Sequence, residues 1–156
     1  MTKTPEPTPT ELPSWIREHV QRYLASDGAD GHLWDSKPQG GPGPIPTLLL
    51  TTTGRRSGRP LTMPLIYTPR GDDFVVIASR GGSPQHPAWY LNLEASPRVT
   101  VQVVARRFDA TARTATGEER TRLWKQMRDL FPPYDTYQTR TAREIPVVVL
   151  SPVASR

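Results

Sequence analysis

Three arginines, a serine and two glycines lie in one short turn, "TGRRSGRP", at positions 53–60. Guanidinium groups are forked donors that suit phosphate and carboxylate, and glycines let a turn aim several backbone N–H groups at one point. The turn is therefore either an anion-binding loop or a solvated hairpin turn, and the residues alone favour neither. The residues that would bind an anion are Arg55, Arg56, Ser57 and Gly58, followed by Arg59.

A second candidate is the stretch "ASRGGSPQHPAWYLNL", in which a strand end leads through a glycine-rich loop into a helix. Backbone N–H groups at such a strand end could contact a planar heteroaromatic ligand, and the helix N-terminus near Ala88 adds partial positive charge. Trp89 is either the wall of a ring pocket or a core anchor. His86 is more typical of a solvated loop than of a catalytic site. The backbone groups that would meet the ligand are those of Ser79, Arg80 and Gly81.

Two phenols form the third candidate, because Tyr134 and Tyr137 in "PPYDTYQ" lie three residues apart and would share one face of a helical turn. A phenol can donate a hydrogen bond to a substrate oxygen or a proton to a developing anion. Phe131 precedes Tyr134 by the same spacing and falls on the same side. Ordinary packing of amphipathic rings explains the pattern equally well, so both interpretations stay open.

Composition limits the classes of function. The net charge of +5 and the pI near 10.0 favour an anionic partner: nucleic acid, an acidic membrane surface, or a phosphorylated or carboxylated small molecule. The absence of cysteine excludes disulfides and thiolate chemistry, and the 3 histidines have no metal-ligand spacing, so no metal is expected. Because no apolar run approaches the roughly 20 residues that span a bilayer and no signal peptide is evident, a cytoplasmic location is expected.

Hydrophobic periodicity predicts three helices. The first covers 12–26, where Ser14 can cap it, and its apolar stripe suits packing on the domain or contact with a membrane or lipid substrate. Its apolar stripe comprises Trp15, Ile16, Val20, Tyr23 and Leu24, and its polar face carries Arg17, Glu18, His19 and Arg22. A short helix starts at Pro87. The third opens with "TGEE", a capping box between Thr116 and Glu119, and its apolar stripe is typical of a core-facing helix. That stripe comprises Leu123, Trp124, Met127, Leu130 and Phe131.

About six strands, mostly linked by short turns, predict an antiparallel sheet that closes into a small barrel. They cover 45–53, 61–68, 74–79, 98–104, 106–114 and 145–151. The proline-rich residues 1–11 have almost nothing apolar to bury and are predicted to be a disordered arm. Residues 12–156 are predicted to be a single domain, since 156 residues suffice for one core and no internal repeat appears.

Three motifs in this order, "LLTTTGRRSGRP", "ASRGGSPQHPAWYLNLEASPRVTVQV" and "TAREIPVVVL", resemble the deazaflavin-dependent nitroreductase family. This is the actinobacterial group of coenzyme F420-dependent oxidoreductases that includes quinone and nitroimidazole reductases. The resemblance runs from about residue 46 to 150, and the first two motifs together are more specific than either alone. It implies a mainly β protein with flanking helices, an FMN-binding split-barrel-like fold of about six antiparallel strands, which is usually dimeric.

By this resemblance the arginine turn meets the phosphate and oligoglutamate tail of F420, and the deazaflavin ring lies along the second motif. Tyr134 would donate to the substrate oxygen, Ser79 would fix the ring or a substrate carbonyl, and Tyr137 would shape the pocket. Reduced deazaflavin would transfer a hydride to a quinone, an enone or lactone, or a nitroaromatic. The implied cofactor-binding residues are Arg55, Arg56, Ser57, Gly58, Thr62, Met63, Pro64, Ala78, Ser79, Arg80, Gly81 and Trp89.

Three positions depart from the family pattern. Arg56 stands where lysine is common and keeps the charge. Leu61 replaces a common arginine, so that either Arg59 compensates or one tail contact is lost. Phe131 lacks the phenol of some relatives, which favours quinone over nitro-group reduction. The expected partners are F420, a small hydrophobic acceptor, a second copy of the chain, and a membrane surface touched by helix 12–26.

Two other functions remain open. An FMN-binding split-barrel oxidoreductase would keep the barrel and exchange the cofactor. A basic nucleic-acid-binding module without catalysis would explain the charge, but aromatic rings are not interleaved with basic residues on the strands as in stacking platforms, so no nucleic acid is expected. Besides these two, a non-catalytic carrier that only buffers the cofactor is a third possibility.

Overall fold

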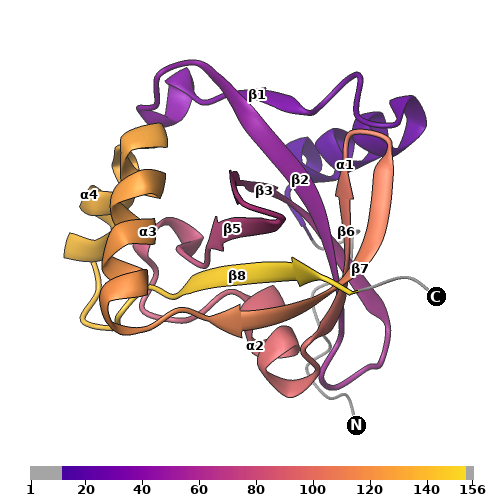
Figure 1. Ribbon diagram of the computed structural model, residues 1–156. Helices are drawn as coiled ribbons and strands as arrows, with labels where there is room; N and C mark the ends of the chain where they lie inside the picture. Colours follow the sequence, from indigo (N-terminus) through magenta and orange to yellow (C-terminus); the bar gives the residue numbers. More distant parts are fainter. Residues whose placement is uncertain (1–11, 154–156) are drawn as a thin grey trace, which may run out of the picture.

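The computed structural model describes residues 12–153, so the arm predicted over 1–11 lies outside the described residues. A curled antiparallel sheet forms the centre, and four α-helices pack around it (Figure 1). The strands are β1 (Leu33–Asp35), β2 (Pro44–Thr53), β3 (Pro60–Ile66), β4 (Thr68–Arg70), β5 (Asp73–Ile77), β6 (Arg98–Val103), β7 (Arg106–Thr114) and β8 (Val147–Pro152). The helices are α1 (Ser14–Ser26), α2 (Ala88–Ala95), α3 (Gly117–Leu130) and α4 (Pro133–Thr139), with short 3₁₀ turns η1 (Lys37–Gln39) and η2 (Arg80–Gly82).

The sheet is a barrel with one open seam. Its strand order is β1-β2-β6-β7-β8-β5-β4, and β3 pairs with β2 alone among the described strands. No ladder joins β3 to β5, so the ring of hydrogen bonds is interrupted between them. This confirms the predicted mainly β, split-barrel fold with flanking helices. The sheet has eight strands rather than about six, because β1 and β4 are three-residue strands that pattern reasoning does not detect.

One predicted strand is divided in two. The stretch 61–68 was expected to be continuous, but β3 ends at Ile66 and Thr68 starts β4, which pairs with β5. Tyr67 separates them and is buried in the barrel core. Within two residues the chain therefore stops pairing with β2 and begins to pair with β5, on the other side of the seam.

Two apolar cores explain the uninterrupted hydrophobic runs of β5 and β8. Val76 and Val148 point into the barrel, whereas their neighbours Val75 and Val147 point to a second core under α3 and α4. Successive side chains of a strand point to opposite faces, so a strand buried on both faces reads as a continuous apolar run. The predicted stripe of α3 faces this second core, where Leu123 and Met127 are fully buried.

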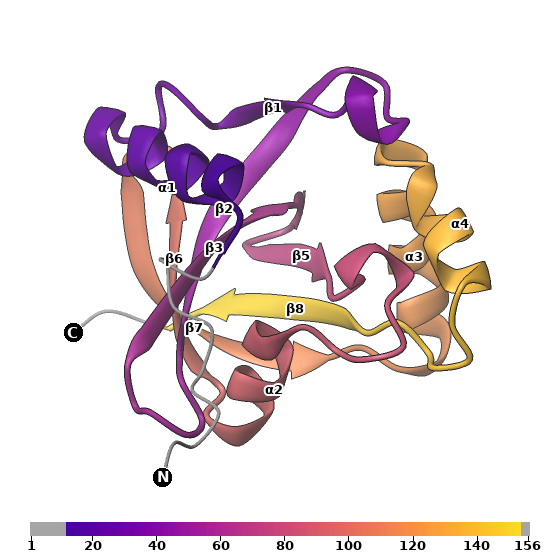
Figure 2. The ribbon, with the colours of Figure 1, turned by 180° about the vertical axis from the view of Figure 1, so that it is seen from behind.

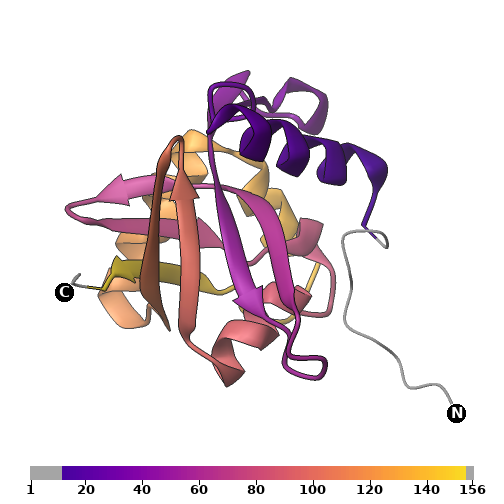
Figure 3. The ribbon, with the colours of Figure 1, turned by 90° about the vertical axis from the view of Figure 1, so that its right-hand side faces the viewer.

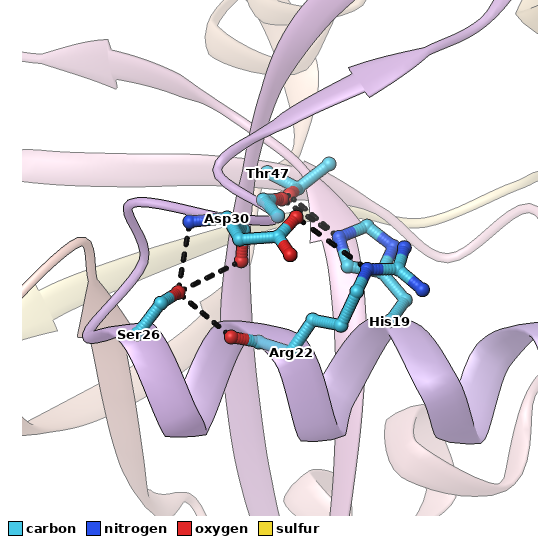
Figure 4. A network of polar contacts seen from close by, with 6 residues as sticks. His19, Arg22, Ser26, Asp30 and Thr47 are labelled. Atoms are coloured by element: carbon cyan, nitrogen blue, oxygen red, sulfur yellow. Dashed lines mark hydrogen bonds and ion pairs between the residues drawn. The ribbon is translucent and has the colours of Figure 1, made fainter.

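Helix α1 is fastened to the sheet by buried polar groups. The Tyr23 hydroxyl lies 3.0 Å from the carbonyl oxygen of Thr47 and 3.3 Å from that of Gln102, and it accepts the Val104 N–H at 2.8 Å. In a second attachment, His19 Nε2 donates to the Gly31 carbonyl oxygen at 2.7 Å. Figure 4 shows His19 beside Thr47 of β2, whose Oγ1 lies 3.5 Å from Nε2. The helix thus has a fixed place over β2.

Two helix-start predictions are wrong. Pro13, not Ser14, is the N-cap of α1, and no side chain caps that helix. Thr116 is the N-cap of α3, but its hydroxyl makes no capping hydrogen bond. Glu119 instead accepts two hydrogen bonds from Arg113, at 2.7 and 2.8 Å, because a bidentate charged pair outcompetes a single backbone contact.

The predicted stripe of α1 also needs correction. His19, expected on the polar face, is buried with Tyr23, whereas Leu24 is 44% exposed. None of the helices in residues 12–153 is long and apolar enough to cross a bilayer.

Candidate active site

A cavity of about 410 Å³ opens beside the seam of the barrel. Strand β3 contributes one wall and β5 contributes Ile77, so the interruption of the sheet creates the entrance. Helix α1 lies on one side and α4 on the other (Figure 2). This volume is typical of small-molecule sites, which lie in the range of roughly 300–1,000 Å³. The residues that line the cavity include Met63, Pro64, Ser79, Arg80, Gly81, Trp89, Phe131, Tyr134 and Tyr137, with Trp15, Ile16, His19 and Trp34.

The structure brings together the two sequence regions predicted to hold a ring and a substrate. Residues 79–81 and the two tyrosines of α4 line the same cavity although more than fifty positions separate them. Met63, Pro64 and Trp89 line it too. Trp89 is only 3% exposed, so it is a core residue and a cavity wall at once.

The loop after β5 lines the cavity and has backbone N–H groups that make no hydrogen bond within the described residues. The N–H groups of Ser79, Arg80 and Gly81 donate to no group in residues 12–153, whereas the next two amides close the η2 turn. Arg80 has φ +45° and Gly81 has φ +62°. A non-glycine residue in this region costs on the order of 1–3 kcal/mol and is frequent at ligand sites. The unused donors and the strained backbone mark the loop as a binding element.

Tyr134 is a buried phenol in an aromatic cluster. Its side chain is 4% exposed, and its ring centroid lies 5.0 Å from that of Phe131 and 6.2 Å from that of Tyr137. Burial raises the pKa of Tyr134 far above its usual value, so the hydroxyl keeps its proton throughout the physiological range. No described residue forms a hydrogen bond with this hydroxyl, which leaves it available to a bound molecule.

Tyr137 is half-buried at the same wall. Burial raises the pKa of its phenol, and the nearby Arg140 guanidinium opposes this shift. That guanidinium lies 5.4 Å from the Tyr137 ring centroid. Tyr137 is therefore a second neutral donor, closer to solvent and to positive charge than Tyr134.

An aromatic wall from α1 and β1 was not predicted. Trp15 stacks on Trp34 with ring centroids 6.3 Å apart, and Trp34 lies 6.2 Å from Phe131. The periodicity of α1 did single out Trp15 and Ile16, but a local pattern cannot say that the helix docks at the cavity. Trp34 lies in a three-residue strand and had no recognisable signal.

The arginine turn lies at the other end of the β2–β3 hairpin, beside α2 (Figure 3). It does not line the cavity, and neither do Thr62 and Ala78. Thr62 shares a hydrogen bond of 2.8 Å with Thr51, and Ala78 is fully buried in the barrel core. The predicted cofactor residues thus form two groups, one at the cavity and one at the turn, joined by β3.

The backbone of the turn is organised by the protein itself. The N–H groups of Gly54, Arg55, Gly58 and Arg59 all donate within the chain, at 2.8, 3.0, 2.9 and 3.1 Å. The expected nest of several amides aimed at an anion is therefore wrong for these four groups. The exposed arginine side chains are the charged groups that this turn offers to an anion.

Asn92 of α2 anchors the turn. It accepts the Arg55 N–H at 3.0 Å and donates to Thr52 Oγ1 at 3.1 Å, and it is itself fully buried. Gly58 has φ +74°, as predicted for a glycine in this turn. The turn is thus a fixed platform that projects cationic side chains beside α2.

The fold defines the class as a split-barrel protein. The solved heme storage protein HutZ of Vibrio cholerae superposes with a TM-score of 0.57 at 20% identity over 70% of this chain and 82% of that chain. A likeness at this identity concerns the fold alone. Among residues 12–153 no group of three or more potential ligands could hold a metal ion.

The family model of the F420H(2)-dependent quinone reductases matches residues 15–152. The F420H(2)-dependent quinone reductase Rv1261c of Mycobacterium tuberculosis is 39% identical over 139 residues, which cover 87% of this chain and 89% of that relative. A solved F420-H2 dependent reductase is 42% identical, with a TM-score of 0.63 over 67% of this chain and 93% of that chain. A solved domain-swapped dimer is 39% identical, with a TM-score of 0.66 over 88% and 98%.

The chain therefore belongs to the F420H(2)-dependent quinone reductase family. Its activity is F420H2-dependent oxidoreduction, and coenzyme F420 is its cofactor. The resemblance drawn from the three sequence motifs is thereby confirmed. The residues present fit this coenzyme: a largely apolar cavity with unused amide donors suits a planar ring, and the arginine turn suits an acidic tail.

Proposed function

We propose that this protein reduces a quinone, with the deazaflavin ring held in the cavity and the acidic tail held at the arginine turn. The observation that carries the proposal is the shared cavity of residues 79–81 and Tyr134, which joins unused amide donors to a neutral, buried phenol. Reduced F420, when bound, supplies a hydride. The other steps fall to the side chains of the cavity.

The cofactor would be held at two places. Arg55 and Arg56 would pair with phosphate and glutamate carboxylates, assisted by Ser57 and Gly58. Strand β3 leads from this turn to the cavity, where the ring would lie on the backbone of the loop after β5. The residues assigned to the ring and its approach are Thr62, Met63, Pro64, Ala78, Ser79, Arg80, Gly81 and Trp89.

Tyr134 would donate a hydrogen bond to the acceptor oxygen on which negative charge develops. Because burial keeps the phenol neutral, it acts as a donor rather than as a base, and a dry cavity strengthens that bond. Ser79 would fix the ring or the acceptor carbonyl. Tyr137 would shape the pocket and hold the acceptor against it.

The cavity favours a quinone over a nitro compound, because it has few hydrogen-bond donors and much apolar surface. Phe131 lies between the tyrosines and the tryptophans and offers no hydrogen bond, so a nitro group finds fewer donors here. The wall of Trp15 and Trp34 presents flat aromatic faces that pack on a planar acceptor and exclude water. The class of acceptor is therefore inferred from Phe131 and the aromatic wall of Trp15 and Trp34, and not from the identity of the cofactor.

A homodimer at a membrane surface completes the proposal. The domain-swapped dimer among the similar solved structures supports self-association. Trp15 and Leu24 of α1 are 52% and 44% exposed, which suits peripheral contact with a bilayer that contains lipid quinone. The protein would act in the cytoplasm.

The proposal is tested by titrating the protein with oxidised and reduced F420 and with FMN, followed by an acceptor screen. We expect saturable F420 binding, no stoichiometric FMN complex, and faster turnover with a naphthoquinone than with a nitroimidazole. Turnover of the nitroimidazole alone would contradict the acceptor assignment, and a stoichiometric FMN complex would contradict the cofactor assignment.

A further inference from the structure

One arginine behind the cavity holds the loop that carries its amide donors. Arg143 lies in the connection before β8, and its guanidinium donates to four acceptors of the loop between β5 and α2. These are the carbonyl oxygens of Ser79 at 2.7 Å, Ser83 at 2.8 Å and Ala78 at 3.3 Å, and Nδ1 of His86 at 3.0 Å. A planar guanidinium has five N–H donors in a fixed fork, so one side chain can fix several points at once.

Arg143 makes most of the hydrogen bonds that this loop receives from outside it, and Arg140 adds one longer bond to the Gly81 carbonyl oxygen at 3.4 Å. The loop contains consecutive residues in left-handed backbone conformations, Arg80, Gly81 and Gly82, at φ +45°, +62° and +82°. Glycines lose more conformational entropy on ordering than other residues, so a loop of this kind needs contacts from outside. The two hydrogen bonds of its own η2 turn, from Gly82 and Ser83, span only three residues each.

Helix α4 packs on the same loop and also positions Arg143. A Cβ added at Gly82 would lie 2.5 Å from the carbonyl oxygen of Tyr137, so loop and helix touch backbone to backbone. Gln138 of α4 donates to the Arg143 carbonyl oxygen at 2.8 Å and accepts the Ile145 N–H at 3.0 Å. The loop, the helix and the connection before β8 are thus joined through one guanidinium.

The acceptors of Arg143 are all neutral groups. Within residues 12–153 no carboxylate forms an ion pair with it, and Arg80 is the charged group that acts on it most directly. A guanidinium without a counter-ion, satisfied by three carbonyls and an imidazole, is placed for its geometry rather than for charge pairing.

We propose that Arg143 is a positioning residue that locks the β5–α2 loop, whose residues 79–81 line the cavity, to helix α4. It thereby sets the place of the coenzyme ring relative to Tyr134 and Tyr137. The second statement rests on the proposed function, which assigns the loop to the ring. The locking itself is a property of the chain without coenzyme.

The locking is tested by amide hydrogen exchange in the protein without coenzyme. In Arg143→Ala we expect the Gly82 and Ser83 amides to exchange at least about tenfold faster, because charge-assisted hydrogen bonds hold their turn. Amides of β2 and β6 should be unchanged. Arg98→Ala, which removes an exposed guanidinium paired with Asp109 on the outside of the barrel, is the matched control and should behave like the wild type.

Arg143→Lys separates geometry from charge. A single ammonium cannot reach four acceptors, so the lysine variant should exchange as fast as Arg143→Ala. Wild-type exchange in either variant would overturn the locking, whatever the coenzyme does.

The positioning is tested by F420 fluorescence titration and by steady-state kinetics. Arg143→Ala should raise the dissociation constant of F420 about tenfold and lower kcat at saturating coenzyme, since displaced reactants lose rate. Fast exchange with unchanged affinity and kcat would overturn the positioning role. If the wild type binds no F420 at all, the proposed function fails while the exchange result still decides the locking.

Discussion

Tyr134 combines burial with an unused hydroxyl, and its role depends on that combination. We expect Tyr134→Phe to bind F420 with wild-type affinity, because the phenol faces the acceptor rather than the tail. Its kcat should fall about 10²- to 10⁴-fold, which is the usual contribution of a positioned proton or hydrogen-bond donor. Stopped-flow oxidation of F420H2 with a quinone measures this loss, and wild-type turnover would remove Tyr134 from the mechanism.

His86 makes one hydrogen bond of the β5–α2 loop depend on pH. Its Nδ1 accepts from Arg143, which only a neutral ring can do, and burial together with the Arg143 charge lowers the pKa of His86 below 6.5. The charge of Glu94 opposes this shift, and the Tyr90 ring packs 4.9 Å from the imidazole. On acidification through the lowered pKa the ring takes up a proton and loses the hydrogen bond from Arg143.

We therefore expect wild-type affinity for F420 to fall between pH 7 and pH 5 more steeply than that of His86→Gln. The glutamine keeps an acceptor oxygen and does not titrate, while ionisations of the coenzyme are common to both proteins. The difference between the two pH profiles, followed by fluorescence titration, isolates His86. Parallel profiles would show that its protonation does not reach the loop.

At the scale of elements, α1 is a cavity wall as much as a surface helix. Trp15→Ala should raise KM for a quinone about tenfold, since an aromatic face is lost, and should change kcat much less. Leu24→Ala removes an exposed apolar side chain of the same helix that does not line the cavity, so its KM should match the wild type. Equal effects of the two variants in soluble assays would contradict the assignment of Trp15 to the acceptor site.

The arginine turn is a separate element with its own test. Arg55→Ala with Arg56→Ala should weaken F420 binding by about 10- to 100-fold, which corresponds to one or two charge-assisted hydrogen bonds. The salt dependence of affinity should flatten, because fewer charges pair with the tail. Affinities at 50 and 300 mM salt measure both effects, and an unchanged slope would exclude the turn as the tail site.

Hydrophobic periodicity was enough to predict the elements that are long and that bury a regular set of side chains. The stripe of α3 was predicted from the residues, and the ends of β2, β5, β6, β7 and β8 were predicted to within two positions. The capping box at Thr116 failed because Glu119 found an arginine on a neighbouring strand, a contact that sequence spacing does not contain. The short strands β1 and β4 have three residues each, too few for a period to appear.

At the scale of the molecule, the site could be predicted only in parts. Motifs indicated the turn, the loop after β5 and the tyrosines. The closure of the cavity by Trp15, Trp34 and His19 depends on where α1 docks, which Tyr23 settles through contacts with Thr47, Gln102 and Val104. Such long-range docking has no local signal. The same is true of Arg143, whose acceptors lie 57 to 65 positions away in the chain.

The stability of the whole molecule should depend on its histidines. Burial lowers the pKa of His19, His32 and His86 below 6.5, so the unfolded chain binds more protons than the folded chain once the pH falls toward that value. The free energy of unfolding should therefore decrease on acidification from pH 7.5 to 5.5. Urea denaturation midpoints measure this decrease. It should shrink in a His32→Gln, His86→Gln variant, and a flat profile in the wild type would contradict the pKa directions.

The proposed function requires above all that the cavity and the arginine turn bind a single coenzyme together. Calorimetry at low salt should compare F420 with its deazaflavin fragment that lacks the phosphate and the glutamates. We predict saturable binding of both, with F420 at least about a hundredfold tighter, since the tail adds several charge-assisted hydrogen bonds. Equal affinities, or no saturable binding of F420, would contradict the claim.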